Sequence, residues 1–370
     1  MRVLIVAAGT GGHITPGISI ADKIKRENPN SEILFVGTKK GIENDIIPKA
    51  GYKIKHIRAS GIERKISVKN IKNACNLILG IFDAKKIIKE FNPDIVVGTG
   101  GFVCFPIFKQ ATKMHIPTML HESNSIPGKV VTTMAYKVDT IMVGFKQAEK
   151  RIKNAKNIVY TGTPSKMTTY VAPENLRKKL DLKENMPVLL IIGGSQGAKK
   201  INEYLVDILC NGKEKNYQTI FVTGPKQYDN VIAQIEKKKC NIDKLKNLKV
   251  LPYVYNMEEY MATADLLISR AGALSLTEIC VMGKPSILIP YPYAAENHQE
   301  YNAKILEKNG AAKVLLERDM SSDTLNGLLE ILINDKNKLF EMGANARKLG
   351  VLDVEDRIYV EIKKLLKGKM

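Results

Sequence analysis

The first thirteen residues of the chain constrain its fold more than any other stretch. The apolar, β-branched run Arg2–Val6 ends in a glycine-rich turn, Ala7–His13, and a helical stretch follows from about Pro16. In doubly wound α/β domains, a buried strand that passes through a glycine turn into a helix presents backbone N–H groups and a helix N-terminus to phosphate. We therefore expect an anion-binding turn here, in which His13 can carry a proton near neutral pH.

The run Val188–Ala198 repeats this pattern later in the chain. A chain of 370 residues is too long for one ordinary core and suits two domains of about 150–200 residues each. Apolar runs alternate with helical stretches in both halves, which predicts an α/β protein with two doubly wound, Rossmann-like parallel sheets. After Arg2–Val6 the main predicted strands are Glu32–Val36, Asp94–Val97, Thr118–Glu122, Asp139–Val143, Asn157–Tyr160, Val188–Ile192, Thr219–Val222, Leu248–Leu251, Asp265–Ser269, Ser286–Ile289 and Lys313–Leu316.

Basic residues outnumber acidic ones, with 57 Lys and Arg against 38 Asp and Glu and a formal net charge of +19. This excess predicts an anionic partner, such as nucleic acid, an anionic lipid surface or a phosphorylated substrate. Trp is absent and no aromatic residues interleave with the basic runs, so we expect no nucleic-acid partner. The five Cys residues form no Cys-x-x-Cys pair, which favours a reduced cytosolic compartment, and the short first apolar run predicts no signal peptide.

Three features of the sequence argue against a nicotinamide dinucleotide or a bound metal. Ile14 occupies the third glycine position of a dinucleotide-binding fingerprint, and the second strand ends in Gly37 rather than in an acid for the ribose. No Asp-x-Asp sequence is present to chelate a divalent cation. We therefore expect no cofactor and no catalytic metal.

A second Gly-Thr-Gly-Gly turn, Gly98–Gly101, follows another predicted strand. Because the carboxyl ends of parallel strands meet at one edge of a sheet, we expect both glycine turns to converge on one multiply charged anion, such as a diphosphate. Thr118–Glu122 ends at the same edge, although ordinary loop polarity would also explain its last residues. The expected anion-binding residues are Thr10, Gly11, Gly12, Thr99, Gly100, Gly101, His121 and Asn124.

The helical stretch after Lys72 is more apolar than a surface helix requires. Two interpretations remain open. The stretch dips into an anionic membrane surface, to which each flanking lysine adds about 1 kcal/mol, or neighbouring elements cover both of its apolar faces. The residues expected to contact a membrane are Leu77, Ile78, Leu79, Ile81, Phe82, Lys69 and Lys72.

Three strand ends of the second half carry polar groups. Gly193–Gly197 offers backbone N–H groups and the Ser195 hydroxyl to a phosphate. Ser269–Ala273 opens a helix that contains Glu278, and Pro290–Gln299 supplies further polar side chains. Each has an ordinary structural explanation when taken alone. At successive carboxyl ends of one parallel sheet, however, they line the crevice in which such folds bind ligands.

Six motifs, in order along the chain, resemble the MurG family of peptidoglycan N-acetylglucosaminyltransferases, which have the GT-B fold. They are G-T-G-G-H at 9–13, G-T-G-G at 98–101, H-E-S-N at 121–124, G-G-S-Q-G-A at 193–198, S-R-A-G-A-L-S-L-T-E at 269–278 and H-Q-E-Y-N-A at 298–303. The resemblance implies two Rossmann-like domains that face a central cleft. Residues 1–163 would hold the lipid-linked acceptor beside the membrane, with residues 353–370 packing back on them as a helix, and residues 164–352 would hold the UDP-sugar donor.

The resemblance further implies that N-acetylglucosamine passes with inversion from UDP-N-acetylglucosamine to the 4-hydroxyl of a polyprenyl-diphosphate-linked muramyl-pentapeptide, the conversion of lipid I to lipid II. His13 would be the general base, with His121 and Glu122 as rivals for that role. Such an enzyme serves cell-wall biogenesis, cell shape and cell division as a peripheral protein on the cytoplasmic face of the cell membrane. The implied donor contacts are Glu278 for the ribose, the backbone near Val254 for uracil, Ser195 and Arg270 for the diphosphate, His298 and Gln299 for the sugar, and Gln196, Ala273, Leu274 and Ser275 around them.

The chain departs from the family pattern at Ser123, where Gln is usual, and at Thr163–Lys166, where the family has Asn-Pro-Val-Arg. Because lysine lacks the planar fork of arginine, Lys166 can offer a donor diphosphate only a point charge. Other functions remain compatible with the residues: transfer to another lipid such as diacylglycerol, UDP-N-acetylglucosamine 2-epimerisation, and non-catalytic sensing of a nucleotide sugar at a membrane.

Overall fold

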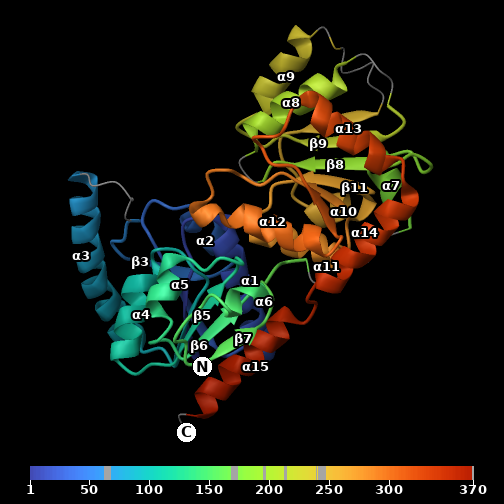
Figure 1. The fold of residues 1–370 in the computed structure, drawn as a ribbon. Helices are drawn as coiled ribbons and strands as arrows, with labels where there is room; N and C mark the ends of the chain where they lie inside the picture. Colours follow the sequence, from blue (N-terminus) through green and yellow to red (C-terminus); the bar gives the residue numbers. More distant parts are fainter. Residues whose placement is uncertain are drawn as a thin grey trace. The chain divides into compact units, whose positions relative to one another are not determined.

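The chain forms two compact units, each with its own sheet and apolar core (Figure 1). Unit 1 comprises Met1–Lys166 and Asp353–Met370, and unit 2 comprises Met167–Leu352. The computed structural model describes residues 1–61, 68–167, 174–194, 197–211, 215–238, 240 and 247–368, apart from the side chains of residues 68–72 and 74.

Unit 1 is built on a seven-stranded parallel sheet with the strand order β3-β2-β1-β4-β5-β6-β7. Its apolar, β-branched central strands are buried, as expected for parallel strands covered by helices on both faces. All seven strands run in the same direction, but the strand order reverses between β1 and β4, and doubly wound folds bind ligands at such a point. The strands are β1 Arg2–Val6, β2 Glu32–Gly37, β3 Lys53–His56, β4 Ile95–Gly98, β5 Thr118–Glu122, β6 Thr140–Val143 and β7 Ile158–Tyr160.

The helices of unit 1 are α1 Gly11–Glu27, α2 Glu43–Lys49, α3 Val68–Phe91, α4 Cys104–Lys113, α5 Lys129–Met134, α6 Lys146–Glu149 and α15 Val354–Lys367. The prediction that α1 starts near Pro16 was wrong. The Thr10 carbonyl accepts hydrogen bonds from the N–H groups of His13 (3.0 Å) and Ile14 (3.1 Å), which closes the first turn over the glycines. His13 therefore lies in the first turn of α1 rather than in a loop.

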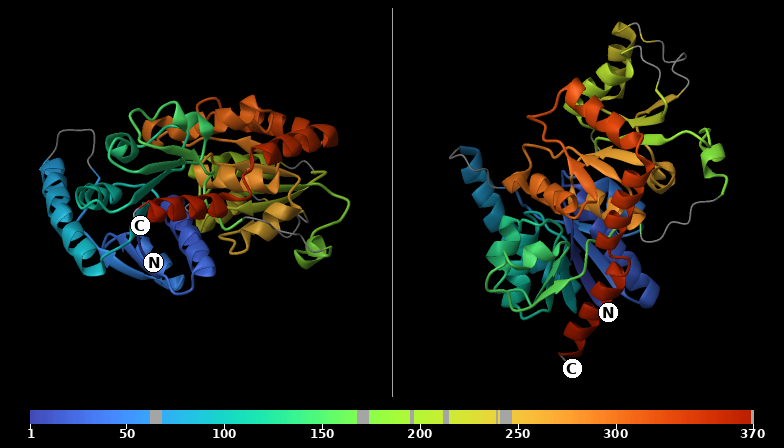
Figure 2. Two further views of the ribbon diagram at one scale, coloured as in Figure 1. Left: turned by 90° about the horizontal axis from the view of Figure 1, so that it is seen from below. Right: turned by 45° about the vertical axis from the view of Figure 1, so that its right-hand side comes forward.

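The C-terminal helix α15 packs alongside α1 (Figures 1 and 2). The Ser19 hydroxyl of α1 donates a hydrogen bond of 2.6 Å to the buried Glu355 carboxylate of α15. Lys23 of α1 forms an ion pair with Asp356, at 2.5 Å. The end of the chain thus braces the helix whose first turn carries His13.

Helix α3 packs on α4 at the edge of unit 1 (Figure 2). Its inner face includes Gly80, where a Cβ would lie 2.1 Å from the Arg58 carbonyl oxygen, so only glycine permits this approach. On the other face Ile78 (56%), Leu79 (39%) and Phe82 (65%) are exposed. The alternative in which neighbouring elements cover both apolar faces was therefore wrong. In the described part of the chain, no helix combines the length and apolar content needed to cross a membrane.

Unit 2 contains a six-stranded parallel sheet with the order β10-β9-β8-β11-β12-β13 and the same reversal, here between β8 and β11. The prediction of two doubly wound parallel sheets is confirmed. The strands are β8 Val188–Ile192, β9 Gln218–Val222, β10 Leu248–Leu251, β11 Leu266–Ser269, β12 Ser286–Leu288 and β13 Ala312–Val314. The helices are α7 Leu176–Lys179, α8 Lys199–Leu209, α9 Tyr228–Lys237, α10 Met257–Thr263, α11 Ala273–Met282, η2 Ala295–Asn297, α12 His298–Lys308, α13 Ser322–Ile333 and α14 Lys336–Leu349.

The last strand ends earlier than expected. The apolar run 313–316 predicts a strand through Leu316, whereas β13 ends at Val314. One further backbone hydrogen bond, from Leu315 N–H to the Leu288 carbonyl (3.0 Å), continues the pairing before the chain turns away. As a result Glu317 lies in the loop at the carboxyl edge of the sheet, beside the loops that follow β8, β11 and β12.

Candidate active site

His13 is held by the strand end that follows β4. Its Nδ1 lies 2.8 Å from the Thr99 carbonyl oxygen, and the Thr99 hydroxyl donates in return to the His13 carbonyl (2.7 Å). Because a carbonyl only accepts hydrogen bonds, Nδ1 carries the proton of the neutral ring. Nε2 is then the nitrogen that can accept a proton.

The second glycine turn is shaped around the His13 ring. Gly100 and Gly101 have φ values of +105° and +83°, which favour glycine. A Cβ on Gly100 would lie 2.8 Å from two atoms of the imidazole. The structure thus brings the two glycine turns together, with the histidine of the first packed on the backbone of the second.

The N-terminus of α1 offers backbone donors to an anion. Thr10, Gly11 and Gly12 are exposed or half-buried. Their N–H groups make no hydrogen bond within the described part of the chain. Such groups, together with the helix dipole, attract phosphate.

A buried carboxylate that sequence reasoning missed lies beneath this turn. Glu43 is fully buried and accepts hydrogen bonds from Gly9 N–H (3.1 Å), Thr38 N–H (2.9 Å) and the Thr38 hydroxyl (2.8 Å). Burial opposes ionisation, but these hydrogen bonds outweigh it and hold the pKa of Glu43 below its usual value. A Cβ on Gly41 would lie 1.9 Å from Glu43 Oε2, so any larger residue at position 41 would clash with the carboxylate.

The first rival for the base role, His121, has both ring nitrogens engaged inside unit 1. Its Nε2–H donates to the Gly162 carbonyl (2.9 Å), and the Ser123 hydroxyl lies 3.2 Å from Nδ1. The residue is fully buried, and burial lowers its pKa to about 4, with His13 adding a smaller effect in the same direction. This histidine is neutral at physiological pH and has no exposed nitrogen.

Glu122, the second rival, organises the loop that follows β5. Oε1 accepts from the backbone N–H (2.8 Å) and side-chain amide (3.1 Å) of Asn124, and Oε2 accepts from Gly128 N–H (2.7 Å). Burial raises the pKa of Glu122, although these hydrogen bonds partly offset the effect. Among the three candidate bases, His13 alone combines partial exposure with a ring nitrogen suited to accept a proton.

Two departures from the family pattern are neighbours in space. A Cβ on Gly144 would lie 2.2 Å from Thr163 Oγ1 and 2.9 Å from the Ser123 carbonyl oxygen. Thr163 and Ser123 are buried, whereas Lys166, the last residue of the first segment of unit 1, is exposed.

In unit 2, the loop after β8 is a tight glycine turn. Gly197 N–H donates to the Gly194 carbonyl (2.9 Å). Gly197 has a φ of +76°, and a Cβ there would lie 2.1 Å from the Thr223 carbonyl oxygen, so the turn needs glycine. The predicted phosphate-binding residues Ser195 and Gln196 lie outside the described residues.

Helix α11 begins at this same edge, directly after β11. Ala273, Leu274 and Ser275 form its first turn, and their N–H groups have no acceptor within the described part of the chain. Ser275 and Glu278 are spaced three residues apart on the helix and are both half-buried, so they share one face. This end of α11 can therefore receive an anion, with Glu278 one turn further along.

Arg270, expected to bind a diphosphate, is already engaged. Its Nη2 lies 2.6 Å from Glu317 Oε2, and Nη1 donates to the carbonyls of Ile289 (3.1 Å) and Pro290 (3.2 Å). The guanidinium carbon lies 5.4 Å from the centre of the Tyr291 ring. These contacts tie the ends of β11, β12 and β13 together. Sequence reasoning missed Glu317 because nothing near it in the chain indicates a partner.

Gln299 and His298 begin α12. Gln299 Oε1 accepts from Tyr291 N–H (2.9 Å) and Ala271 N–H (3.2 Å), which leaves its amide NH₂ as a donor for other groups. His298 Nδ1–H donates to the Ala295 carbonyl (2.7 Å), and burial lowers the pKa of His298. The two residues before α12, Glu296 and Asn297, have positive φ values. This conformation is sparsely populated, costs free energy and is frequent at functional sites.

Val254 lies in the loop after β10 and is buried between two exposed tyrosines, Tyr253 and Tyr255. Their rings pack edge to face with centroids 5.0 Å apart. The loop therefore presents aromatic surface around a backbone segment at the carboxyl edge of the sheet.

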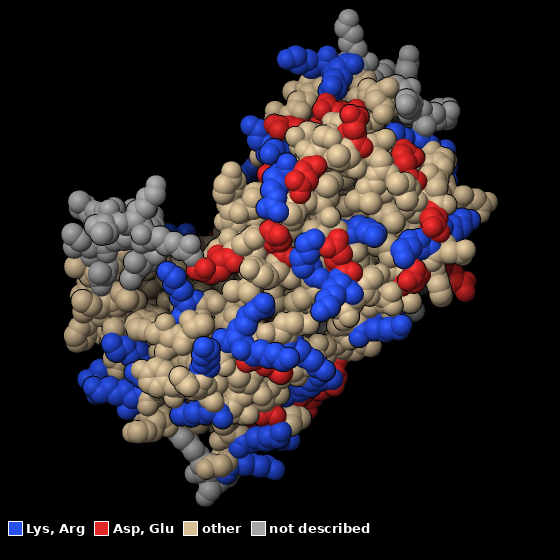
Figure 3. Space-filling view, in the orientation of Figure 1, with Lys and Arg blue, Asp and Glu red and all other residues tan. Residues whose placement is uncertain are grey.

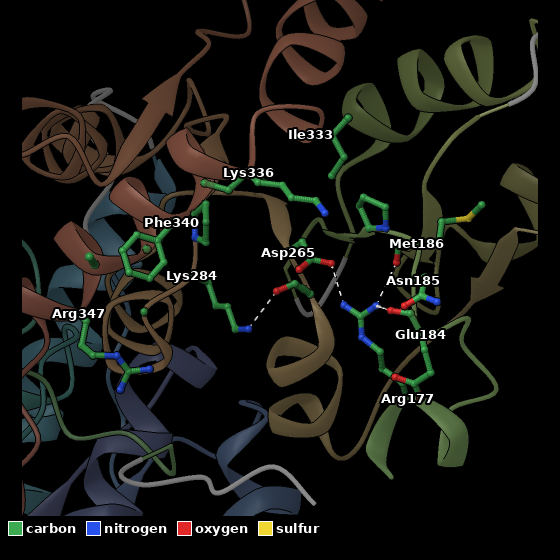
Figure 4. Close-up of a pocket in the computed structure, with 17 residues that line it drawn as sticks. Arg177, Glu184, Asn185, Met186, Asp265, Lys284, Ile333, Lys336, Phe340 and Arg347 are labelled. Atoms are coloured by element: carbon green, nitrogen blue, oxygen red, sulfur yellow. Dashed lines mark hydrogen bonds and ion pairs between the residues drawn. The ribbon is translucent and has the colours of Figure 1, made fainter. Parts of the chain in front are cut away.

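A cavity of about 780 Å³ lies at the opposite edge of unit 2 (Figure 4). Figure 4 shows Lys284 and Arg177 on either side of Asp265, which precedes β11. Arg177 pairs with Asp265 (2.9 Å), and Lys284 donates to the carbonyls of Ala262 (2.8 Å) and Ala264 (2.9 Å). Burial lowers the pKa of Lys284 to about 8. Both cations are thus used inside unit 2, Arg177 by the Asp265 carboxylate and Lys284 by two backbone carbonyls. They lie at the edge opposite the candidate donor loops.

Two doubly wound units, each with glycine-rich loops at the point where its strand order reverses, have the architecture of a GT-B glycosyltransferase. Residues 3–143 match the glycosyltransferase family 28 N-terminal domain, and residues 188–358 match the glycosyltransferase family 28 C-terminal domain. The chain belongs to glycosyltransferase family 28, within its MurG group.

Similar proteins cover the whole chain. It is 43% identical to a protein of Alkaliphilus oremlandii, with all of both chains covered, and 41% identical to one of Acetivibrio thermocellus, with 100% of this chain and 99% of the relative covered. Both relatives are named UDP-N-acetylglucosamine–N-acetylmuramyl-(pentapeptide) pyrophosphoryl-undecaprenol N-acetylglucosamine transferase. The crystal structure of Acinetobacter baumannii MurG matches with a TM-score of 0.77 at 27% identity, covering 98% of this chain and 99% of that one.

The Glu43 contacts lead to a prediction about stability. In Glu43→Gln an amide NH₂ meets either Gly9 N–H or the Thr38 donors, so we expect the free energy of unfolding at pH 7 to fall by about 1–3 kcal/mol. The pKa of Glu43 is lower in the folded state than its value of 4.5 in the unfolded chain. The Glu43 charge therefore adds to the free energy of unfolding above pH 4.5, and this contribution is lost as the pH falls from 4.5 through the folded-state pKa. Denaturant unfolding at pH 7 and pH 4 measures this difference.

Glu27→Gln is the matched control, because Glu27 is a partly exposed acid of α1 paired with Lys23. It should change stability by less than about 1 kcal/mol. A Glu43→Gln variant as stable as wild type, or a deficit that is equal at both pH values, would contradict the assignment.

Proposed function

We propose that the chain transfers N-acetylglucosamine from UDP-N-acetylglucosamine to the 4-hydroxyl of a polyprenyl-diphosphate-linked muramyl-pentapeptide, with inversion, in peptidoglycan synthesis. The observation that carries the proposal is full-length identity of about 40% to relatives named for this reaction. The glycine-rich loops at the point where the strand order of each sheet reverses support it. Solved UDP-N-acetylglucosamine 2-epimerases share the fold at 13–16% identity, which supports no common reaction.

In this proposal unit 2 binds the donor. The free N–H groups at the start of α11 and the glycine turn with Ser195 and Gln196 receive the diphosphate, and Glu278 binds the ribose hydroxyls. The backbone near Val254 pairs with uracil. His298 and the Gln299 amide NH₂ contact the sugar, with Ala273, Leu274 and Ser275 lining the site. Charge-assisted hydrogen bonds of about 1.5–3 kcal/mol each stabilise the departing UDP.

Unit 1 binds the acceptor, in the same proposal. The N–H groups of Thr10, Gly11 and Gly12, with those of Gly100 and Gly101 and with Asn124, receive the acceptor diphosphate. Thr99, also expected there, is fully buried and donates its N–H to the Val6 carbonyl and its hydroxyl to the His13 carbonyl, so it positions the turn instead. His13 Nε2 takes the proton of the attacking 4-hydroxyl, the oxygen bonds to the anomeric carbon, and the bond from that carbon to the UDP oxygen breaks. A positioned base of this kind contributes about 10²–10⁴-fold to the rate.

The proposal is tested with purified protein, UDP-N-acetylglucosamine and a short-chain muramyl-pentapeptide diphosphate lipid, in EDTA, by measuring UDP. We expect UDP release only when the lipid is present. Donor turnover without lipid would indicate an epimerase, and release that requires diacylglycerol would indicate a different acceptor. Binding of UDP without any release would indicate a nucleotide-sugar sensor. Each of these outcomes overturns the proposed reaction.

His13→Ala should lower kcat by about 10²-fold or more, because the base is lost. UDP binding should be retained, since the donor residues lie in unit 2. His115→Asn is the control, because His115 is an exposed histidine in a left-handed conformation that Asn tolerates. Unchanged turnover in His13→Ala would remove His13 from the base role.

We also propose that unit 1 docks on an anionic membrane as a peripheral protein of the cytoplasmic face. Unit 1 has 32 Lys and Arg against 16 Asp and Glu, a net charge of +16, whereas unit 2 has 25 against 22, a net charge of +3. Figure 3 displays basic side chains spread over unit 1. The exposed apolar face of α3 carries Ile78, Leu79 and Phe82, and half-buried Leu77 and Ile81 adjoin it. The side chains of Lys69 and Lys72 lie outside the described residues.

The double variant Ile78→Ser/Phe82→Ser should weaken binding to vesicles containing phosphatidylglycerol by tenfold or more, because burial of each large apolar side chain is worth about 1.5–3 kcal/mol. Turnover of a short-chain soluble acceptor should be retained. Ile331→Ser/Phe340→Ser is the matched control, since both side chains are exposed in unit 2. Equal vesicle binding by the two double variants would refute docking through α3.

A further inference from the structure

Arg270 is the only Lys or Arg in the loops that follow β10, β11 and β12 of unit 2. Both it and Glu317 are almost fully buried, with side-chain exposures of 12% and 9%. Nη1 is committed to the carbonyls after β12 and Nη2 faces Glu317, while Nε–H has no acceptor in the described part of the chain. The cation most suited to a diphosphate at this edge is thus held by an acid of the protein itself.

The Glu317 carboxylate is incompletely satisfied. Oε2 lies 2.6 Å from Arg270 Nη2 without the alignment of a hydrogen bond, and no other donor within the described residues reaches it. Oε1 lies 4.0 Å from Lys200 Nζ, at the limit of an ion pair. A buried carboxylate with so few donors costs free energy, so this arrangement requires an explanation.

Lys200 can serve as a second cationic partner for the Glu317 carboxylate if Arg270 moves away. It lies in the first turn of α8, directly after the glycine turn that follows β8, and its side chain is half exposed. Its flexible stem allows the ammonium to close the remaining gap to Glu317. Glu317 therefore has two cations within reach, one already in contact and one held slightly away.

We infer that Glu317 competes with the donor diphosphate for Arg270. In the empty site Glu317 holds the guanidinium. When the diphosphate binds, Arg270 turns to it through Nε and Nη2, and Lys200 closes on Glu317 so that the buried carboxylate keeps a partner. Glu317 is thus a positioning residue that weakens retention of the UDP product. This inference rests on the proposed UDP-sugar site.

The test is calorimetric titration of UDP and uridine into the full chain. Glu317→Gln keeps the shape of the side chain and removes its charge, so Arg270 loses its competing partner. We expect UDP to bind about tenfold more tightly, because the Glu317 contact and the diphosphate contact both require Arg270 and couplings of this size are typical. Uridine, which has no phosphate, should bind with unchanged affinity. Weaker or unchanged UDP binding in a variant that unfolds at the wild-type temperature would overturn the inference.

Lys200→Ala tests the exchange of partners separately. In the wild-type background we expect UDP binding to weaken by about two- to fivefold, because Glu317 then loses the cation that replaces Arg270. In the Glu317→Gln background the same substitution should have no effect, since the carboxylate charge is gone. Equal losses in both backgrounds would indicate direct contact between Lys200 and UDP and would contradict the exchange.

Glu341→Gln is the matched control for removal of one negative charge. Glu341 forms an exposed ion pair with Lys338 on α14 of unit 2, and its loss should leave UDP affinity unchanged. The controls also separate this inference from the proposed function. If the wild-type chain binds no UDP, the donor site itself is wrong; if it binds UDP and Glu317→Gln does not bind it more tightly, only the competition is wrong.

Discussion

The hydrogen bond from His13 Nδ1 to the Thr99 carbonyl is the interaction on which the rest of the candidate site depends. It joins the ends of β1 and β4, the two parallel strands between which the strand order of unit 1 reverses. Gly100 must be glycine for the imidazole to reach that carbonyl, and α1 must begin at Gly11 for His13 to lie in its first turn. One contact therefore selects the tautomer of the proposed base and places it beside the free N–H groups of the helix.

Each unit also places a buried carboxylate next to the loop that we propose binds an anion. Glu43 lies beneath the first glycine turn and fixes Gly9 within it, and Glu317 holds Arg270 at the corresponding edge of unit 2. A negative charge beside a phosphate site weakens anion binding, so these acids are costly unless they organise the donors around them. Glu43 has three donors and braces its loop firmly. Glu317 has an incomplete set, which suits a contact that is exchanged during a reaction cycle.

The fold could be predicted well from the sequence, because buried parallel strands appear as short apolar, β-branched runs between glycine turns and helices. The two glycine turns that meet at His13 were also predictable, since the topology brings the ends of parallel strands together. The side-chain partners were not, because Glu43 lies 34 residues from Gly9 and no local pattern links Arg270 to Glu317. For the same reason the sequence left His121 and Glu122 as rival bases. Only their buried hydrogen bonds separate them from His13.

The central claim is that the neutral His13 ring carries its proton on Nδ1 and accepts another on Nε2. Nitrogen NMR of protein labelled with ¹⁵N-histidine measures this directly, because protonated and unprotonated ring nitrogens resonate apart and the chain has only five histidines. His13 is assigned by the signal lost in His13→Ala. The account predicts a neutral Nδ1–H tautomer at pH 8. A neutral Nε2–H tautomer would contradict it, because the nitrogen proposed to take the acceptor's proton would already hold one.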